Sequence, residues 1–408
     1  MFDVEYVTYE ELYIAYLDCR KHKRQSVNSL DFELNDTLKL YHLWKDLNTQ
    51  KYTIGRSIAF CVDNPVKREV FAADFRDRIV HHLIIRRLIK TIDEEVFIDD
   101  SYSCREGKGV LYGVKRCQEQ LAIIKKTHPN AYIIRGDLKS FFMSIDKGIL
   151  FNQLVALLEM VYPEDRIQLD YMKWLIKLVI YNEPQINCIR KQHISAWDDL
   201  PPHKSLFHSK KNTGIPIGNL TSQIFANFFL TLFDLYIQNL PCVLGYGRYV
   251  DDFWVVVDAE TQVQKIIDGM KNFLWNNLKT TLHPHKIYVQ KINRGLKFIG
   301  AIIYDDRVYV ANRTKGNFFR TIRSFTLDKY STPEKLLHFE SSINSYLGYM
   351  IHYSSFNLRR GIVCANPIIA NFYHIDPSCT KILYRKRYSP ALKAGLFYSP
   401  YLLSLDYY

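Results

Sequence analysis

Three aspartates at the ends of apolar segments could bind a metal ion together. Asp251 and Asp252 are adjacent in "GRYVDDFWVVVD", and Asp137 follows the apolar run of "AYIIRGDLKSFF". Neighbouring carboxylates raise each other's pKa and destabilise a fold unless a cation neutralises them. Because hard oxygen ligands favour Mg²⁺ or Mn²⁺, we predict that these three acids are catalytic residues that bind two Mg²⁺ ions, with Mn²⁺ as the alternative.

The geometry of a strand limits how these acids can meet. Adjacent residues of a strand point to opposite faces, so Asp251 and Asp252 can approach one site only at the tip of a tight hairpin. Asp137 also ends a strand-like run and is followed by a turn. Such an arrangement on a basic protein suits two-metal phosphoryl transfer, with an activated hydroxyl and a leaving pyrophosphate. The alternative is that "VDD" is a surface turn and Asp137 a helix cap, and only the combination of all three acids favours the metal site.

Composition and charge indicate the class of partner. The 408 residues are enough for two or three subdomains. The chain has 54 Lys and Arg against 42 Asp and Glu, a formal net charge of +12. An excess of this size points to a polyanionic partner, nucleic acid first. The alternative is a basic surface without a partner.

Cysteines and apolar runs indicate the compartment. The eight cysteines form no Cys-x-x-Cys pair, so neither a zinc site nor a disulfide framework is indicated. No apolar run approaches ~18 residues, the length that spans a membrane. The first residues carry acids where a signal peptide needs basic residues. We therefore expect a reduced, cytoplasmic protein with no membrane partner.

Hydrophobic periodicity and turn residues place the aspartates in a mixed pattern of helices and strands. The expected elements are helices over 1–50, short strands over 58–70, a basic amphipathic helix over 75–92, a strand over 131–138, helices over about 147–181, a loop insertion over 183–213, a helix over 219–240, strands over 247–258 and 286–304, and basic helices from 312 onward.

Taken in order, these segments resemble the motifs of reverse transcriptases. "YVDD" resembles their Tyr-x-Asp-Asp box, "GDLKSFF" their first palm motif, and "GIPIGNLTSQIFANFFLTLFD" the loop and helix that cradle the nucleotide and template. "LHPHKIYVQ" resembles the next motif, "LKFIGAII" the primer-grip hairpin, and "VKREVFAADFRDRIVHH" and "SYSCREGKG" the fingers motifs. The matches cover roughly residues 55–305 in the family's order, which makes the resemblance specific.

The resemblance implies an α+β, right-hand polymerase fold with fingers, a palm built from an antiparallel sheet plus helices, and a helical thumb. It places an N-terminal helical extension at 1–55, fingers at 56–136, palm at 137–311 and the thumb and C-terminal region at 312–408. It also implies RNA-directed DNA polymerase activity. The implied partners are template RNA, cDNA and deoxynucleoside triphosphates.

The resemblance assigns site residues motif by motif. The implied metal ligands are Asp137, Leu138, Asp251 and Asp252, with Asp252 the weaker ligand. The residues placed at the nucleotide are Lys67, Arg68, Phe141, Phe142, Ile217, Gly218, Gln223, Val250 and Lys286. The residues placed on the nucleic acid are Arg78, Arg105, Lys108, Asn219, Tyr249, Phe298 and Gly300.

Several of these roles have plain structural alternatives. Lys67 and Arg68 of "PVKRE" neutralise the triphosphate in the implied mechanism. The alternative is that these two residues belong to an ordinary basic turn. Phe142 is the implied steric gate against a 2′-hydroxyl, or a core phenylalanine. Lys286 is the implied proton donor to pyrophosphate, or a lysine on a strand edge. The resemblance implies that Arg105 and Lys108 contact template phosphates. The alternative is that they are solvent-exposed residues of a loop.

One departure narrows the resemblance. Most reverse transcriptases carry Gln-Gly-x-x-x-Ser-Pro where Ile217 to Gln223 read Ile-Gly-x-x-x-Ser-Gln, a form similar to the enzymes of diversity-generating retroelements. That family implies mutagenic retrohoming: a template-repeat RNA is copied into cDNA with errors at template adenines, together with a small basic pentameric accessory protein. We expect Ile217 to relax nucleotide positioning, because it can only pack where Gln would hydrogen-bond. The alternatives are a group II intron-like or defence-associated reverse transcriptase, and a non-enzymatic RNA-binding protein with a polymerase fold.

Overall fold

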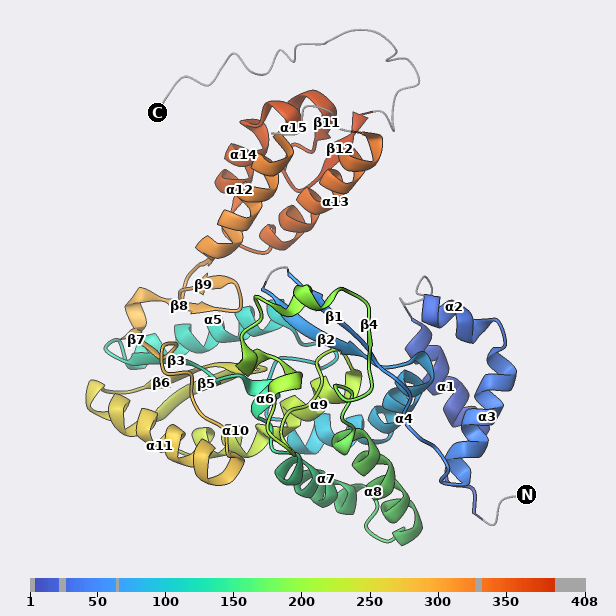
Figure 1. Cartoon of the computed structure of the whole chain (residues 1–408). Coiled ribbons are helices and arrows are strands. Elements are labelled where there is room, and N and C mark those ends of the chain that lie inside the picture. The colour runs from blue at the N-terminus through green and yellow to red at the C-terminus, as the bar shows by residue number, and fades with distance from the viewer. Residues whose placement is uncertain (1–3, 22–26, 64–65, 327–331, 386–408) are drawn as a thin grey trace, which may run out of the picture. The chain divides into compact units, whose positions relative to one another are not determined.

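The computed structural model (Figure 1) describes residues 4–21, 27–63, 66–326 and 332–385. Packing divides the chain into two compact units. Unit 1 comprises residues 1–110 and 132–290, and unit 2 comprises residues 111–131 and 291–408. Residues 386–408 of the predicted thumb lie outside the described residues. The division into fingers, palm and thumb stays a prediction, because its boundaries are not those of the two compact units.

A four-stranded sheet carries the three aspartates, two at strand ends and one in the turn between two strands. Its order is β5 (Val243–Tyr249), β6 (Asp252–Val257), β3 (Tyr132–Asp137) and β7 (Tyr288–Lys291), and β6 is antiparallel to both neighbours. The residues of β6 that follow Asp252 are all buried. Helices α10 (Thr231–Gln238) and α11 (Glu260–Leu278) pack against the sheet. Full burial explains why β6 is a continuous apolar run rather than an alternating one.

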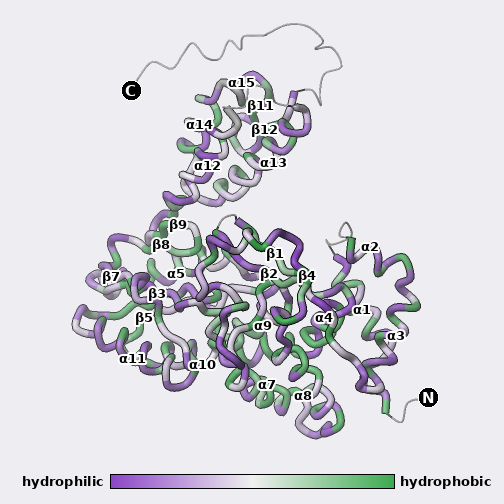
Figure 2. Tube along the Cα trace, in the orientation of Figure 1, coloured by the Kyte–Doolittle hydropathy of each residue, from purple (hydrophilic) through white to green (hydrophobic). Residues whose placement is uncertain are grey.

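The remaining core helices of unit 1 are strongly apolar. They are α6 (Phe141–Ser144), α7 (Lys147–Val161), α8 (Arg166–Tyr181) and α9 (Leu220–Phe229). Figure 2 shows long hydrophobic stretches in α7 and α9. By length and composition the stretch Leu220–Gln238 could cross a membrane, but 72% of its most apolar window is buried inside the protein. Burial of this kind is typical of a core helix.

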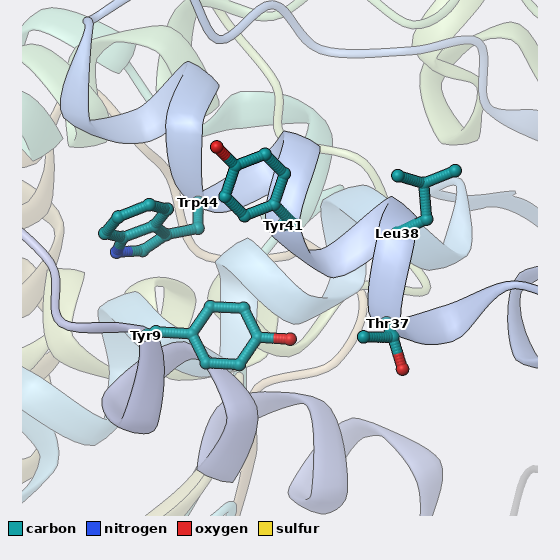
Figure 3. A pocket seen from close by; sticks show the side chains of 5 residues that line it. All are labelled: Tyr9, Thr37, Leu38, Tyr41 and Trp44. Carbon is teal, nitrogen blue, oxygen red and sulfur yellow. The ribbon is translucent and has the colours of Figure 1, made fainter.

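The N-terminal helices confirm the helical prediction for the described part of 1–50. They are α1 (Tyr9–Arg20), α2 (Val27–Glu33) and α3 (Asp36–Asn48), and α1 packs on α4 (Phe75–Thr91), the predicted amphipathic helix. Helix α4 continues into the short helix η1 (Ile92–Val96). An apolar hollow of about 630 Å³ between α1 and α3 is lined by Tyr9, Thr37, Leu38, Tyr41 and Trp44 (Figure 3). No residue of the predicted site lines this hollow.

The segment 183–213 is more ordered than the loop insertion that the sequence predicts. The predicted strands over 58–70 are β1 (Ile58–Val62) and β2 (Arg68–Ala72), and β4 (Ile189–Arg190) from the insertion pairs parallel to β1. Three short helices follow, η2 (Ile194–Trp197), η3 (Pro202–Lys204) and η4 (Leu206–His208). Buried Glu69 of β2 accepts hydrogen bonds from Trp197 Nε1, Ser205 Oγ and the Leu206 amide at 2.7–2.8 Å. The loop prediction was therefore wrong for β4, because elements this short leave no periodicity in the sequence.

Unit 2 combines helices with two small antiparallel sheets, so both units bear out the predicted α+β class. One sheet has the order β10 (Val308–Val310), β9 (Ala301–Ile303) and β8 (Leu296–Phe298), and the other pairs β11 (Tyr373–Ile375) with β12 (Ile382–Tyr384). The helices are α5 (Val110–Thr127), which enters unit 2 at Leu111, then η5 (Ile292–Arg294), α12 (Asn312–Thr326), α13 (Pro333–Met350), α14 (Phe356–Cys364) and α15 (Pro367–Phe372).

A fully buried ion pair joins the central sheet to its helices. Arg248 of β5 and Asp234 of α10 both have side chains that are 0% exposed. Arg248 Nε donates to Asp234 Oδ1 at 2.6 Å, and Nη1 donates to Asn227 Oδ1 of α9 at 2.7 Å. The Tyr246 hydroxyl donates to the same Asp234 oxygen at 2.6 Å. Because every charge here is paired and hydrogen-bonded, burial is tolerated.

We predict that Arg248→Met lowers the free energy of unfolding by about 3–5 kcal/mol, because it leaves the buried charge of Asp234 without its cation. Adding Asp234→Leu should recover much of that loss. Urea unfolding followed by circular dichroism measures both effects, with exposed Arg166→Met as the control. A loss no larger than that of the control would show that the pair does not hold the core together.

Candidate active site

A strained turn brings the paired acids to the tip of a hairpin, as the sequence predicts. Val250, between β5 and β6, has φ +56°, a conformation that costs a β-branched residue roughly 1–2 kcal/mol. Its amide donates to Ser103 Oγ at 3.1 Å, and its carbonyl accepts from Arg248 Nη1 at 2.9 Å. The turn therefore leaves Asp251 at the tip and Asp252 as the first residue of β6.

The register of the sheet brings Asp137 to the same place. Asp137, the last residue of β3, is directly opposite Asp252, and the Leu138 amide donates to the Asp251 carbonyl at 3.3 Å. Lys286 Nζ donates to both carboxylate oxygens of Asp137 at 3.0 Å. Three acids and Lys286, separated by up to 149 residues in the sequence, thus meet at one end of the sheet.

Asp252 has a different cation. Arg135, two residues before Asp137 on β3, donates Nε and Nη2 to the two carboxylate oxygens of Asp252, each at 2.9 Å. The guanidinium carbon also lies 5.8 Å from the ring centroid of Tyr288, within the range of a cation–π contact. Asp252 is therefore held in a two-pronged ion pair.

The pKa values single out Asp251. Burial, with the charge of Asp137 as a second cause, raises the pKa of Asp251 to about 6. Burial also raises the pKa of Asp252, although Arg135 opposes this shift. Among the described ion pairs, Asp137 and Asp252 each have a cation and Asp251 has none. A partly buried carboxylate beside a second acid is the environment that a divalent cation stabilises.

The donor set fits a hard divalent cation in part. The side chains of Asp137 and Asp251 and the backbone of Leu138 supply oxygen donors of the kind that Mg²⁺ binds. Within the described ranges, no group of three or more His, Cys, Asp or Glu is arranged to hold a metal ion. Both oxygens of Asp252 accept hydrogen bonds from Arg135. Two acids therefore fit the predicted metal site directly, and the assignment of all four ligands stays a prediction.

The loop that resembles the nucleotide cradle docks on β2. The Phe71 amide donates to the Ile217 carbonyl at 2.8 Å, and the Ala73 amide donates to Asn219 Oδ1 at 3.1 Å. Gly218 has φ +123°, and a Cβ there would stand 2.7 Å from a methyl of Val70. Glycine is therefore required between Ile217 and Asn219.

Ile217 and Phe142 share one apolar cluster. Both are partly buried against Ala59, Phe71, Met143 and Leu206. The ring of Phe142 also makes an edge contact with buried Phe141, with centroids 5.7 Å apart. The predicted gate and the predicted fidelity residue thus pack against the same cluster, although 75 residues separate them in the sequence.

Three basic residues that the sequence places on the nucleic acid make contacts within the protein. The side chain of Arg105 is only 4% exposed and pairs with Asp93, and its Nη1 donates to the Ile98 carbonyl at 2.6 Å. This placement favours a structural role over a template contact. Arg78 Nε donates to the Ala73 carbonyl at 2.8 Å, and Lys108 Nζ donates to the Asp99 carbonyl at 2.7 Å.

The remaining predicted site residues are divided between the two units. Lys67 lies 3.8 Å from exposed Asp199, and Arg68 and Gln223 are exposed. Tyr249 is partly buried, and burial raises its pKa. Phe298, which is buried, and Gly300, with φ +85°, belong to unit 2. Their predicted roles stay predictions.

Sequence reasoning missed the residues that support the site. Arg135, Arg248, Asp234 and Asn227 were assigned no role, although each is a polar residue inside an otherwise apolar strand or helix. A charge in such a position must be paired when the segment is buried. This signal could have marked Arg248, which directly precedes "YVDD".

One protein family matches more than half of this chain. Residues 67–303 match the family described as reverse transcriptase (RNA-dependent DNA polymerase), and this match confirms the predicted polymerase fold. No curated protein matches the chain.

The solved structures that the chain resembles include telomerases from two Candida species. Telomerase from Candida albicans in complex with a fragment of telomeric RNA is 11% identical with a TM-score of 0.45, over 73% of this chain and 54% of that one. Telomerase from Candida tropicalis in the corresponding complex is 13% identical with a TM-score of 0.45, over 80% and 58%. The chain therefore spans about half the length of these telomerases.

The raised pKa of Asp251 predicts a pH-dependent stability. The pKa of Asp251 is about 6 in the folded protein against an ordinary value of 3.8. Ionisation of Asp251 therefore destabilises the folded protein by an amount that grows between pH ~4 and pH ~6 and is constant above pH ~6. Asp251→Asn should raise the free energy of unfolding of the metal-free protein at pH 7.5 by about 1–3 kcal/mol and leave it nearly unchanged at pH 4.

Urea unfolding in EDTA at the two pH values measures this difference. Asp258→Asn, an exposed acid just beyond β6, is the matched control and should change neither value. An equal gain at both pH values, or none at pH 7.5, would contradict the assignment.

Proposed function

This chain belongs to the reverse transcriptase (RNA-dependent DNA polymerase) family, and from this premise we propose that it copies an RNA template into DNA. The observation that carries the proposal is the meeting of Asp137 with the Asp251–Asp252 hairpin at one end of the sheet. The net charge of +12 suits template RNA, cDNA and deoxynucleoside triphosphates as partners.

Asp137 and Asp251, with the backbone of Leu138, hold the divalent cations in this proposal, and Mg²⁺ is the expected ion. When bound, these ions supply the charge that lowers the pKa of the primer hydroxyl and stabilises the leaving pyrophosphate. Lys286, now on Asp137, is the group that can carry a proton to that pyrophosphate. Lys67 and Arg68 neutralise the triphosphate.

Selection of the nucleotide falls to the apolar cluster around Phe142. Its ring acts as the steric gate, which rejects a 2′-hydroxyl. Ile217 packs in the same cluster and offers the nucleotide no polar contact beyond its backbone. A site without that contact loses ~1 kcal/mol of positional discrimination, which supports an error-prone polymerase.

The finer proposal is a reverse transcriptase of a diversity-generating retroelement. It is supported by the Ile-Gly-x-x-x-Ser-Gln form of residues 217–223. In this role the enzyme copies a template-repeat RNA, makes errors at template adenines and works with a small basic pentameric accessory protein. None of the eight cysteines, all within the described ranges, forms a disulfide, which supports a reducing, cytoplasmic setting.

Primer extension on an RNA template with Mg²⁺ and deoxynucleoside triphosphates tests the enzymatic proposal. Asp137→Asn and Asp251→Asn should each slow extension by roughly a thousandfold, because each removes a charged ligand. Asp258→Asn should extend like the wild type. Full activity in the aspartate variants would refute the metal role, and an inactive wild type would favour a non-enzymatic RNA-binding protein.

Sequencing of the cDNA tests the retroelement proposal. The wild type should misincorporate chiefly at template adenines, and Ile217→Gln should lower that error rate about fivefold, corresponding to ~1 kcal/mol of restored discrimination. Ile217→Val keeps the apolar packing and is the control. An unchanged adenine error rate in Ile217→Gln would exclude Ile217 as the cause, and a wild type without adenine errors would exclude the retroelement proposal.

A further inference from the structure

The two cations at the end of the sheet hold their carboxylates in different ways. Lys286 Nζ is a single charged atom on a flexible stem, and its side chain is 47% exposed. It can leave Asp137 when another cation arrives, because a solvated lysine loses little on release. Asp137 is therefore a carboxylate that can exchange its partner.

Arg135 holds Asp252 more firmly. Its planar guanidinium donates to both oxygens at 2.9 Å, the paired geometry that gives Arg–carboxylate contacts their strength. The two side chains are only 23% and 19% exposed, and Tyr288 lies against the guanidinium. The contact with Tyr288 limits the directions in which Arg135 can move.

The backbone makes this pairing a built feature of the sheet. Asp137 is opposite Asp252 and Arg135 is opposite Trp254, so Arg135 is the diagonal neighbour of Asp252 on the same face. Residues two apart on a strand share a face, which also places Arg135 beside Asp137. A cation that approached Asp252 would have to displace Arg135 and meet its charge.

We propose that Arg135 is a positioning residue that keeps Asp252 out of the metal coordination shell, so that Asp137 and Asp251 alone supply carboxylate ligands. This inference rests on the proposed function, because it concerns the same metal site. Its consequence is that Asp252 serves to orient Arg135 and the end of β6. Removal of Arg135 releases Asp252 as an additional anionic ligand.

Mn²⁺ binding to the full-length, metal-free protein tests the inference without substrate. Calorimetric titration, or electron paramagnetic resonance of Mn²⁺, gives the dissociation constant. Arg135→Gln should bind Mn²⁺ roughly tenfold more tightly than the wild type, because affinity rises with the number of charged ligands. Asp252→Asn should bind like the wild type, and the double variant should lose the gain of Arg135→Gln.

A matched control separates this effect from a general loss of arginine. Arg20 of α1 pairs with both oxygens of Glu33 at 2.7 and 3.2 Å, so Arg20→Gln breaks a similar ion pair in the N-terminal helices and should leave Mn²⁺ binding unchanged. Circular dichroism confirms that each variant is folded. Should Arg135→Gln fail to fold, Asp252→Asn alone still decides the question.

Two results would overturn the inference. One is Mn²⁺ binding by Arg135→Gln that equals the wild type or is weaker. The other is a loss of Mn²⁺ affinity in Asp252→Asn as large as in Asp251→Asn, which would make Asp252 a ligand. If instead Asp137→Asn and Asp251→Asn also leave Mn²⁺ binding intact, the metal site of the proposed function fails together with this inference.

Discussion

The buried ion pair between Arg248 and Asp234 is the interaction on which the geometry of the site depends. It links β5 to α10, and the same guanidinium reaches Asn227 on α9 and the carbonyl of Val250 in the turn. An unpaired charge in this position would cost several kcal/mol, so the strand, the two helices and the turn form only as a set. The strain at Val250 is thereby offset, and Asp251 is held at the end of β3.

Charge balance at the end of the sheet is the second constraint. Asp137, Asp251 and Asp252 face two protein cations, Lys286 and Arg135, so the metal-free site has one negative charge in excess. That excess lies on Asp251, whose pKa is raised to about 6. In the proposed function, this carboxylate is where a divalent cation binds, and stability in the absence of metal is lowered in return. The side of the site that resembles a nucleotide cradle is by contrast apolar, around Phe142 and Ile217.

Local features of this protein could be predicted from its sequence. The hairpin at "GRYVDD", the strand that ends at Asp137 and the amphipathic helix α4 all have periodic patterns or turn residues within a few positions. The order of motifs then indicated the family and the α+β fold, which the match over residues 67–303 confirms. These features depend on neighbours in the chain, which a sequence shows directly.

Features that depend on distant partners could not be predicted. The partner of Asp252 is 117 residues away in Arg135, and Glu69 holds an insertion more than 125 residues further on. The buried position of Arg105 follows from its contact with Asp93, and a basic loop residue gives no sign of this. Patterns of residue type report burial and period, but they do not report which of many charged residues will meet.

Anomalous diffraction from crystals soaked in Mn²⁺ tests the central claim, that the turn set by Arg248 creates a cation site from Asp137 and Asp251. We expect an anomalous peak in contact with the carboxylates of Asp137 and Asp251, with Lys286 displaced from Asp137 and Arg135 still paired with Asp252. A peak that contacts Asp252 but neither of the other two acids, or no peak at the end of this sheet at saturating Mn²⁺, would contradict it.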